Sequence, residues 1–299
     1  MAQPRIANVK ALAKINLSLR VLHKRPDHYH ELRTVFQTIS LGDEITLIFT
    51  PARNTQVTIE SSVEIANNLA VRAAQAVLET SRASGKVHII LEKKIPMGGG
   101  LGGGSTDAAA VILALPALTG KRLTRETQAT VAAGLGSDGP FFLIGGTVLD
   151  LGRGEELYPF PEPKTSYGLL LTPAIHVSTP EAYRALGRTT DPLPDNNYST
   201  GTWRLGEGAR LAQWKQLCEN DFEEAVFQLH PELGRLRQRM ERAGARIARM
   251  TGSGSAIFGL FDCRQQAMEA AKKFTGTPHA LFRTVSKRQY DKLWGEALR

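Results

Sequence analysis

Six of the seven residues from Gly98 to Gly104 are glycine, and this run is the strongest chemical signal in the sequence. It follows a predicted strand over residues 86–95 and precedes an apolar stretch that predicts a helix. Glycines at such a junction let backbone N–H groups approach a polyphosphate, and the start of the helix adds its positive dipole. Ser105 and Thr106 stand where a hydroxyl caps the helix or reaches a phosphate or its magnesium ion. A flexible linker is the alternative, but the flanking strand and helix favour a phosphate-binding loop.

This run matches neither of the familiar phosphate-binding motifs in full. Gly98, Gly100 and Gly103 satisfy G-x-G-x-x-G, but a second predicted helix follows where a dinucleotide-binding fold needs a strand that ends in an acidic residue. The residues from Gly99 to Thr106 spell G-x-x-x-x-G-S-T, which is a P-loop without the lysine that holds the β- and γ-phosphates. The sequence therefore predicts a phosphate cradle of another type.

A lysine and an aspartate supply the groups that phosphoryl transfer to an alcohol uses. Residues 9–21 alternate between apolar and polar types, which predicts a strand with Lys14 and Asn16 on its polar face. Asp138 follows a helix predicted over residues 125–135, in a loop from Ser137 to Pro140. A carboxylate can take the proton of the attacking hydroxyl, and a lysine can stabilise the developing charge. Taken singly, a solvent-facing strand lysine and a turn aspartate explain these two residues as well.

Several segments, spread over nearly the whole chain, resemble motifs of the GHMP kinase superfamily. They are Ala13-Lys14-Ile15-Asn16-Leu17, Tyr29-His30-Glu31-Leu32, the run from Pro96 to Ala109, the loop from Gly136 to Phe142, the segment from Asn220 to Glu223, and Thr251-Gly252-Ser253-Gly254-Ser255. Their order along the chain is also that of the family. The doubled glycine triplet resembles in particular the branch whose substrate carries a cytidine diphosphate.

The resemblance implies a role for each site residue. It makes Lys14 and Asp138 the catalytic pair. It assigns ATP to Pro96, Met97, Gly98, Gly99, Gly100, Leu101, Gly102, Gly103, Gly104, Ser105, Thr106, Asn68 and Leu69. It assigns the second substrate to Asn16, Tyr29, His30, Tyr183, Thr251 and Gly252, with the two tyrosines stacking on a cytosine and the histidine bonding to its edge. Core packing is an alternative of nearly equal weight for Tyr183.

The implied reaction is transfer of the γ-phosphoryl group of ATP to the 2-hydroxyl of a cytidine-diphosphate-linked methylerythritol, in the non-mevalonate isoprenoid pathway. ATP brings Mg²⁺, for which no protein ligand can be named. The sequence departs from the family pattern at His28, where a glycine is usual, at Gly139, where a valine is usual, and at Ala66, where an aspartate is common. Gly139 is expected to add backbone freedom beside Asp138.

The resemblance also implies a two-domain α+β fold. Residues 1–155 are expected to form a domain like the second domain of ribosomal protein S5, with the ATP loop and the catalytic pair. Residues 156–299 are expected to form a ferredoxin-like domain. A segment rich in proline, glycine and charge, over residues 153–164, marks the boundary between them. Separate strands are predicted around residues 35–40 and 44–49, and a helix from Leu69 with Asn67 or Asn68 as its N-cap. A strand is predicted to begin at Phe141, and the last element predicted is a strand.

Composition limits the partners without choosing one. The chain of 299 residues has a formal net charge of +8, which suits an anionic partner such as a phosphorylated metabolite, a nucleic acid or an acidic membrane. No apolar run approaches the ~20 residues that span a bilayer, and the start has no signal-peptide pattern. Cys218 and Cys263 could form one disulfide, but two buried thiols of a cytoplasmic protein are expected instead. We expect small-molecule partners only, neither nucleic acid nor membrane, and a monomer or weak homodimer.

Two other functions fit parts of the pattern. A GHMP kinase for homoserine or a mevalonate-type alcohol shares the glycine loop and Asp138 but has no use for a cytosine site at Tyr29 and His30. A basic RNA-binding module is the alternative that is not an enzyme. It predicts binding that weakens steeply with salt and no turnover of ATP.

Overall fold

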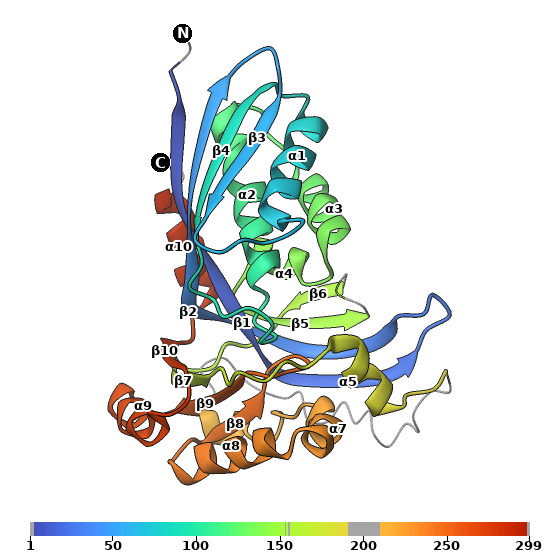
Figure 1. The fold of residues 1–299 in the computed structure, drawn as a ribbon, viewed down its shortest axis with the longest axis vertical. Helices are drawn as coiled ribbons and strands as arrows, with labels where there is room; N and C mark the ends of the chain where they lie inside the picture. The colour runs from blue at the N-terminus through green and yellow to red at the C-terminus, as the bar shows by residue number, and fades with distance from the viewer. Residues whose placement is uncertain (1–2, 153, 155, 191–209, 298–299) are drawn as a thin grey trace.

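The structure is a computed structural model that describes residues 3–152, 154, 156–190 and 210–297. The fold is of the α+β class, as predicted, and is built on two sheets (Figure 1). The six-stranded sheet belongs to the N-terminal half of the chain and the four-stranded sheet to the C-terminal half. In Figure 1 the two sheets lie one above the other, and the strands β1 and β2 run from one to the other.

The six-stranded sheet has helices on one face. Its strands are β1 (Arg5–Lys24), β2 (His30–Pro51), β3 (Gln56–Ser61), β4 (Gly85–Glu92), β5 (Thr147–Gly152) and β6 (Glu156–Pro159). They follow the order β3-β4-β2-β5-β6, with β1 paired antiparallel to β2. The helices are α1 (Leu69–Ser81), α2 (Gly103–Thr119), α3 (Arg125–Leu135) and α4 (Gly139–Ile144). The alternating residues of the strands bury their apolar side against the almost wholly apolar helix α2.

The four-stranded sheet is antiparallel throughout. Its strands are β7 (Tyr167–Leu171), β8 (Ile247–Met250), β9 (Ile257–Phe261) and β10 (His279–Arg283), in the order β10-β7-β9-β8. The helices of this half are α5 (Thr179–Leu186), α6 (Leu211–Trp214), α7 (Phe222–Leu229), α8 (Pro231–Arg242), α9 (Arg264–Ala271), the 3-10 turn η3 (Lys272–Phe274) and α10 (Lys287–Ala297). The succession of β7, helices, β8, β9, α9 and β10 is the βαββαβ pattern of the predicted ferredoxin-like domain.

Three segments tie the two halves together. Strand β1 bridges to Asn220 through Leu19, and β2 bridges to Thr284 through Ile39. Helix α10 returns from the end of the chain to the first half, where Tyr290 packs beside Leu12 of β1. Two elements after residue 155 belong with the first half: β6 is a strand of the six-stranded sheet, and α10 packs against β1 of that sheet. The domain boundary at residue 155 therefore stays a prediction.

Four details differ from the sequence-based expectations. The two strands expected around residues 35–40 and 44–49 are parts of the single strand β2. The apolar residues after Asp138 form helix α4 rather than a strand, because Pro140 occupies the first turn of the helix and Phe141 is buried against other aromatic rings. Helix α10 was not expected. Cys263 is exposed, whereas Cys218 is buried as expected.

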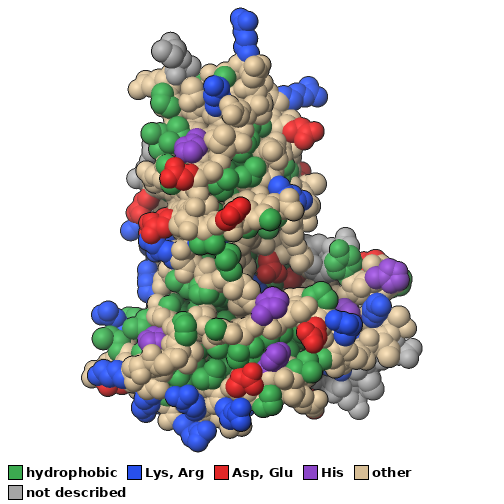
Figure 2. All heavy atoms as spheres, in the orientation of Figure 1, with side chains coloured by type: hydrophobic (Ala, Val, Ile, Leu, Met, Phe, Trp, Pro, Cys, Tyr) green, Lys and Arg blue, Asp and Glu red, His purple; other side chains and the backbone are tan. Residues whose placement is uncertain are grey.

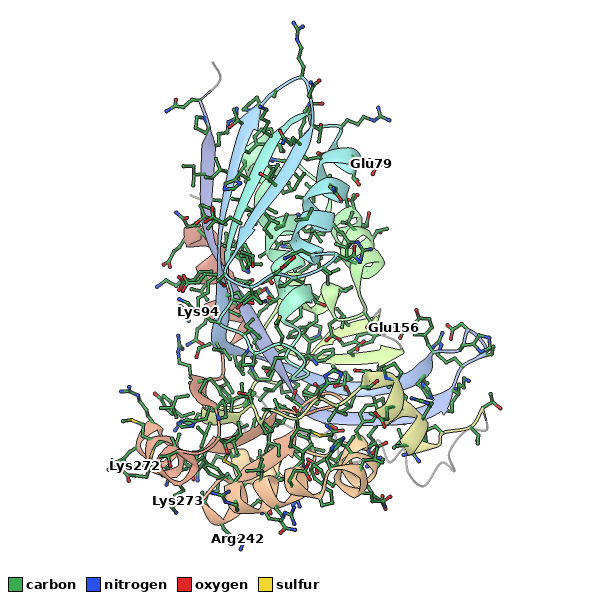
Figure 3. All side chains as sticks on the ribbon, in the orientation of Figure 1. Glu79, Lys94, Glu156, Arg242, Lys272 and Lys273 are labelled. Atoms are coloured by element: carbon green, nitrogen blue, oxygen red, sulfur yellow. The ribbon has the colours of Figure 1, made fainter. Side chains whose placement is uncertain are left out.

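Lys and Arg are spread over the face that Figure 2 shows, and several of them lie along its lower edge, on the C-terminal half. In Figure 3, Arg242, Lys272 and Lys273 extend outward from the helical layer of the C-terminal half. These side chains belong to the end of α8 and to η3, so this part of the excess charge forms a solvated helical surface. Within the described residues, no helix combines the length and apolar character that crossing a membrane requires.

Candidate active site

A cleft of about 410 Å³ opens between the two halves of the molecule. Its walls come from β1, the glycine loop, the start of α4, helix α5 and the loop after β8. Lys14, Asn16, Leu69, Gly100, Ser105, Asp138, Tyr183 and Gly252 are among the residues that line it. Predicted site residues from both halves of the chain therefore meet in one cavity.

The predicted catalytic pair lies in this cleft. The Nζ atom of Lys14 is 3.4 Å from Oδ2 of Asp138, and the two side chains are 4% and 32% exposed. Lys14 belongs to the polar face of β1, and its Nζ also lies 4.8 Å from the centre of the Phe36 ring. Asp138 stands at the N-cap position of α4, but its side chain makes no capping hydrogen bond. The carboxylate is thus held beside the lysine and open to the cleft.

Asn16 links Lys14 to the opposite wall of the cleft. Its Oδ1 accepts hydrogen bonds from Lys14 Nζ at 2.8 Å, from Gly252 N at 3.0 Å and from Thr251 Oγ1 at 3.1 Å. Its Nδ2 donates to Thr34 Oγ1 at 2.8 Å. The side chain is buried, and these four bonds occupy most of its hydrogen-bonding capacity. This geometry places Asn16 where it can orient Lys14. Asn16 also lines the cleft, so its predicted contact with substrate stays a prediction.

The glycine loop has the backbone that its composition requires. Gly98, Gly100 and Gly102 all have φ near +70°, a region that other residues rarely occupy. A Cβ atom on Gly100 would lie 2.3 Å from the Thr251 carbonyl oxygen, so the loop packs closely against the third motif. Gly102 is the N-cap of α2 and has no side chain to bond the first N–H groups of the helix. Those N–H groups have no intrahelical partners, and an anion at this end would accept from them.

The two hydroxyls after the loop have different surroundings. Ser105 lines the cleft. Thr106 is buried, and its hydroxyl donates to the Leu12 carbonyl at 2.8 Å, which ties α2 to β1. Of the two, only Ser105 lines the cleft, so its predicted contact with a phosphate stays a prediction.

The predicted nucleotide residues outside the glycines have mixed surroundings. Leu69 lines the cleft. Its side chain also lies close to Gly104, where an added Cβ atom would be 3.3 Å from it. Asn68 uses its Oδ1 to cap α1 through Ala70 N. Leu101 is buried, and its carbonyl accepts from the backbone N–H of Lys14 at 3.1 Å. At the start of the loop, Pro96 and Gly99 lie beside the exposed Met97.

The third glycine motif is supported by residues that the sequence alone did not place in the site. Asn220 Nδ2 donates to the carbonyls of Met250 at 2.8 Å and Gly252 at 2.9 Å. Glu223 Oε1 accepts from Met250 N at 2.8 Å, and burial raises the pKa of this carboxyl. The N-D-F-E segment therefore holds the loop that in turn contacts Asn16.

The predicted base-binding residues lie at the α5 side of the cleft. The rings of His30 and Tyr183 stack with their centres 4.5 Å apart, and Phe222 meets Tyr183 edge-on at 4.8 Å. Burial lowers the pKa of His30, so its imidazole is neutral near pH 7 and offers one donor and one acceptor. Tyr29 is 58% exposed and faces an adjoining hollow that shares Gly136 with the cleft. The structure thus places His30, rather than Tyr29, against Tyr183.

Two of the departures from the family pattern have a local explanation. His28 has φ +67°, so it occupies the conformation for which a glycine is usual. Gly139 is buried, and a Cβ atom there would lie 2.5 Å from the carbonyl oxygen of Ala132. The glycine therefore permits a close approach of α3 to the start of α4. The added backbone freedom expected beside Asp138 stays a prediction.

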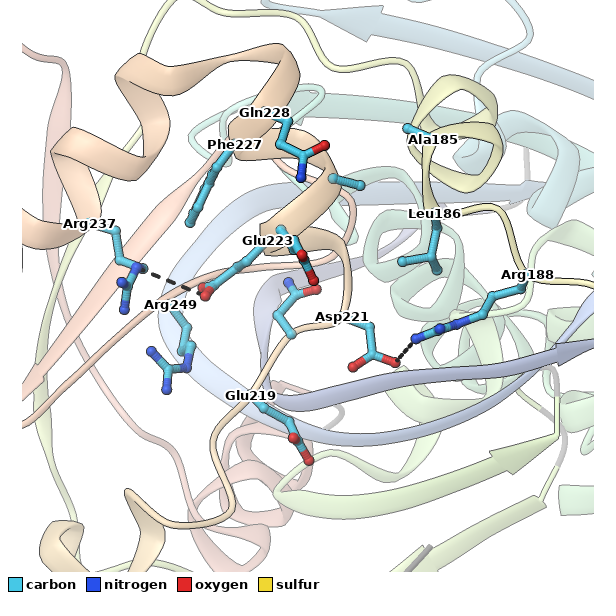
Figure 4. Close-up of a pocket in the computed structure, with 13 residues that line it drawn as sticks. Ala185, Leu186, Arg188, Glu219, Asp221, Glu223, Phe227, Gln228, Arg237 and Arg249 are labelled. Atoms are coloured by element: carbon cyan, nitrogen blue, oxygen red, sulfur yellow. Dashed lines mark hydrogen bonds and ion pairs between the residues drawn. The ribbon is translucent and has the colours of Figure 1, made fainter. Parts of the chain in front are cut away.

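A larger hollow of about 690 Å³ lies on the C-terminal half and is shown in Figure 4. Its charged side chains pair with one another, as in Arg188 with Asp221 at 3.1 Å and Arg237 with Glu223 at 3.9 Å. It contains none of the predicted site residues. The cleft with Lys14 and Asp138 is therefore the candidate active site.

Comparison with known proteins agrees with this geometry. Residues 68–146 match the family model of the GHMP kinases N terminal domain, and residues 204–278 match that of the GHMP kinases C terminal. A 4-diphosphocytidyl-2-C-methyl-D-erythritol kinase of Solibacter usitatus is 46% identical over 100% of this chain and 95% of its own length. The enzyme of the same name from Gloeobacter violaceus is 38% identical over 90% of each chain.

Solved structures show the same relationship. A crystal structure of 4-(cytidine 5'-diphospho)-2C-methyl-D-erythritol kinase superposes with a TM-score of 0.76 at 37% identity, over 93% of this chain and 98% of the other. The homoserine kinase of Cytophaga hutchinsonii reaches 0.71 at 20% identity, over 94% and 95% of the two chains, and shares the fold alone. Two domain matches and relatives of this similarity over nearly the full length establish that the chain belongs to the GHMP kinases and, among them, to the 4-diphosphocytidyl-2-C-methyl-D-erythritol kinase family.

Proposed function

We propose that this chain transfers the γ-phosphoryl group of ATP to the 2-hydroxyl of 4-diphosphocytidyl-2-C-methyl-D-erythritol, as a cytoplasmic step of the non-mevalonate isoprenoid pathway. The observation that carries the proposal is the cleft in which Lys14, Asp138 and the glycine loop meet Tyr183, the ring that stacks on His30. The first three supply the parts of a kinase for an alcohol, and the stack supplies a surface for a base.

In this mechanism the chain mainly positions the reactants. Asp138 takes the proton of the 2-hydroxyl as its oxygen attacks the γ-phosphorus and the bond to the leaving ADP breaks. Lys14 stands 3.4 Å from the same carboxylate, where its charge offsets the negative charge that develops on the transferred group. The N-terminus of α2 and the backbone of the glycine loop hold the phosphates of ATP.

Mg²⁺ fits this site as an ion that enters with ATP. Among the described residues, no group of three or more His, Cys, Asp or Glu side chains is arranged to hold a metal. Mg²⁺ characteristically keeps several waters and binds through substrate phosphates with only one or two protein ligands. When bound, it would neutralise phosphate charge, and Ser105 and Asp138, which line the cleft, would be the residues able to offer it oxygen ligands.

Recognition of cytosine distinguishes this proposal from a homoserine or mevalonate kinase. A neutral His30 can donate to one atom and accept from another on the edge of a cytosine. Stacking of a base on an aromatic ring contributes about 1–3 kcal/mol. In the structure Tyr183 already stacks on His30, so the base would have to lie against the remaining surface of this pair and against Tyr29 at the mouth.

A coupled assay of ADP release tests the proposal. Turnover is expected with 4-diphosphocytidyl-2-C-methyl-D-erythritol and not with homoserine or mevalonate. His30→Ala and Tyr29→Ala are expected to raise KM for the cytidine substrate about 5- to 150-fold, which corresponds to the loss of ~1–3 kcal/mol, with a smaller effect on KM for ATP. Equal turnover of homoserine, or equal damage to both KM values with a lowered melting temperature, would contradict the cytidine assignment.

A further inference from the structure

A buried cluster of three charged residues underlies the glycine loop. Lys93 Nζ donates to Asp107 Oδ2 at 2.7 Å and also to Asp43 Oδ2. The side chains of Lys93, Asp43 and Asp107 are 5%, 0% and 2% exposed. Burying three charges is costly, and a buried ion pair is often no more stable than an apolar replacement. Such a cluster therefore calls for an explanation other than stability.

The cluster holds the start of the loop through Asp43. Its Oδ1 accepts from the backbone N–H groups of Lys94 at 2.5 Å and Ile95 at 2.7 Å, the two residues that precede Pro96. Asp43 lies in the middle of the long strand β2 and is fixed by the sheet. The entry to the glycine loop is thus attached to the sheet by a carboxylate.

The same lysine holds the end of the loop. Asp107 is in the second turn of α2, directly after Gly104, Ser105 and Thr106. A Cβ atom on Gly103 would lie only 3.3 Å from Lys93 Nζ, so the ammonium group lies directly beneath the first turn of α2. One lysine therefore joins the strand before the loop to the helix after it, at the point where the free N–H groups of α2 begin.

The charges of the cluster are unequal, with two carboxylates to one ammonium. Burial and the neighbouring Asp43 raise the pKa of Asp107 to about 7, against the opposing effect of Lys93. Burial would lower the pKa of Lys93, but the two carboxylates outweigh it and raise that pKa. The lysine thus stays charged and keeps both of its bonds to the ends of the loop.

The next residue in the chain provides an internal contrast. Lys94, labelled in Figure 3, is 40% exposed and pairs with Glu44 at 2.7 Å and Glu92 at 3.6 Å on the open face of the sheet. Lys94 and Lys93 therefore each bind two carboxylates, but only the pairs of Lys93 join the two ends of the loop.

We propose that Lys93, Asp43 and Asp107 are positioning residues that fix the glycine loop and the first turn of α2 in the conformation that binds the ATP phosphates. This inference rests on the proposed kinase function. It gives the cluster no contact with either substrate and no part in proton transfer. Its effect is to keep the N–H donors in place before ATP arrives, so that binding does not have to order them.

The test measures binding and turnover separately. Asp107→Asn is nearly isosteric and leaves Lys93 and Asp43 as a balanced pair, so the protein is expected to fold. Calorimetric titration with the non-hydrolysable analogue AMP-PNP and Mg²⁺ at pH 8, where Asp107 is ionised, is expected to show about tenfold weaker binding, since a neutral amide oxygen replaces the carboxylate as the acceptor for Lys93. KM for ATP rises to match, whereas kcat at saturating ATP and KM for the cytidine substrate change less than about twofold.

A second variant and a control make the result decisive. Asp43→Asn keeps an oxygen for the two backbone N–H groups but removes the charge that faces Lys93, and it is expected to weaken AMP-PNP binding in the same way. Glu44→Gln removes the equivalent charge beside Lys94 on the exposed face and is expected to leave binding unchanged.

Two results would overturn the inference. One is unchanged AMP-PNP affinity in a folded Asp107→Asn protein. The other is equal weakening of both substrates together with a lower urea midpoint, which would show a general structural role. If instead the wild-type chain bound AMP-PNP but did not phosphorylate the cytidine substrate, the proposed function would fail, and the AMP-PNP titrations would still decide this inference.

Discussion

Replacing Asp138 by asparagine should stop catalysis while leaving the fold intact. The side chain makes no capping hydrogen bond, and its ion pair with Lys14, at 3.4 Å, is 32% exposed on the aspartate side. Lys14 is only 4% exposed, so the loss of its charged partner should lower the free energy of unfolding by about 1–3 kcal/mol, which is less than the ~5–15 kcal/mol by which folded proteins are typically stable. Lys14 keeps its hydrogen bond to Asn16 and its position beside the Phe36 ring.

The expected effect on the rate is much larger. Loss of a general base lowers turnover by ~10²–10⁴. At ~1.36 kcal/mol for each factor of ten, this is about 3–5 kcal/mol of barrier height. ADP release under saturating substrates gives kcat, AMP-PNP titration gives the nucleotide affinity, and urea unfolding gives stability. Asp262→Asn, which breaks a surface pair with Arg246, serves as the control. A variant with more than a tenth of wild-type turnover would show that Asp138 only begins helix α4.

Three further changes test other parts of the argument. Gly139→Val should lower the free energy of unfolding, measured in urea, by about 1–3 kcal/mol, because its Cβ would lie 2.5 Å from the Ala132 carbonyl oxygen. An unchanged free energy of unfolding would mean that α3 shifts to make room for the valine at no cost. His28→Gly should leave the free energy of unfolding within ~1 kcal/mol of wild type, because glycine adopts the left-handed conformation without strain but loses more backbone entropy on folding. His28→Val should lower the free energy of unfolding by more than ~1 kcal/mol, because valine is strained in that conformation. KM for the cytidine substrate should be constant from about pH 8 to 6.5 and should rise at lower pH. The pKa of His30 is lowered from the ordinary value of 6.5 for histidine, so the imidazole becomes protonated only below that pH. If KM also rose at low pH in His30→Ala, another group would be responsible.

Much of the fold could be predicted because its signals are local. Alternation over residues 9–21 predicts β1, and Asn68 caps α1 where an N-cap residue is expected. Helix α3 has the predicted bounds, with a threonine N-cap before it and Gly136 after it. The secondary structure of the apolar residues after Asp138 could not be predicted from local signals. Four of them in succession fit a buried strand or a buried helix equally, and only the packing of Phe141 in an aromatic cluster decides for the helix α4.

Parts of the candidate site depend on contacts across the sequence, and no local pattern contains these. Asn16 and Thr251 are 235 residues apart, yet they share two hydrogen bonds. The Lys93 cluster joins residues 43, 93 and 107, and in the sequence each of these looks like an ordinary surface charge. The two hydroxyls at Ser105 and Thr106 could not be separated either, because only the path of α2 against β1 shows that Thr106 bonds to Leu12.

The length of β1 explains why the site lies between the two halves. It pairs with β2 from Arg5 to Lys24, so its beginning lies in the upper sheet, and near its other end Leu19 also bridges to Asn220 of the C-terminal half. Lys14 lies between these regions, so its neighbours come from both halves: Asp138 from one side, and Thr251 and Gly252 through Asn16 from the other. A shift of the C-terminal half would therefore move the group that orients Lys14. The position of the lysine relative to Asp138 depends on how the two halves pack, and substitutions at their contact should change kcat even where they touch no substrate.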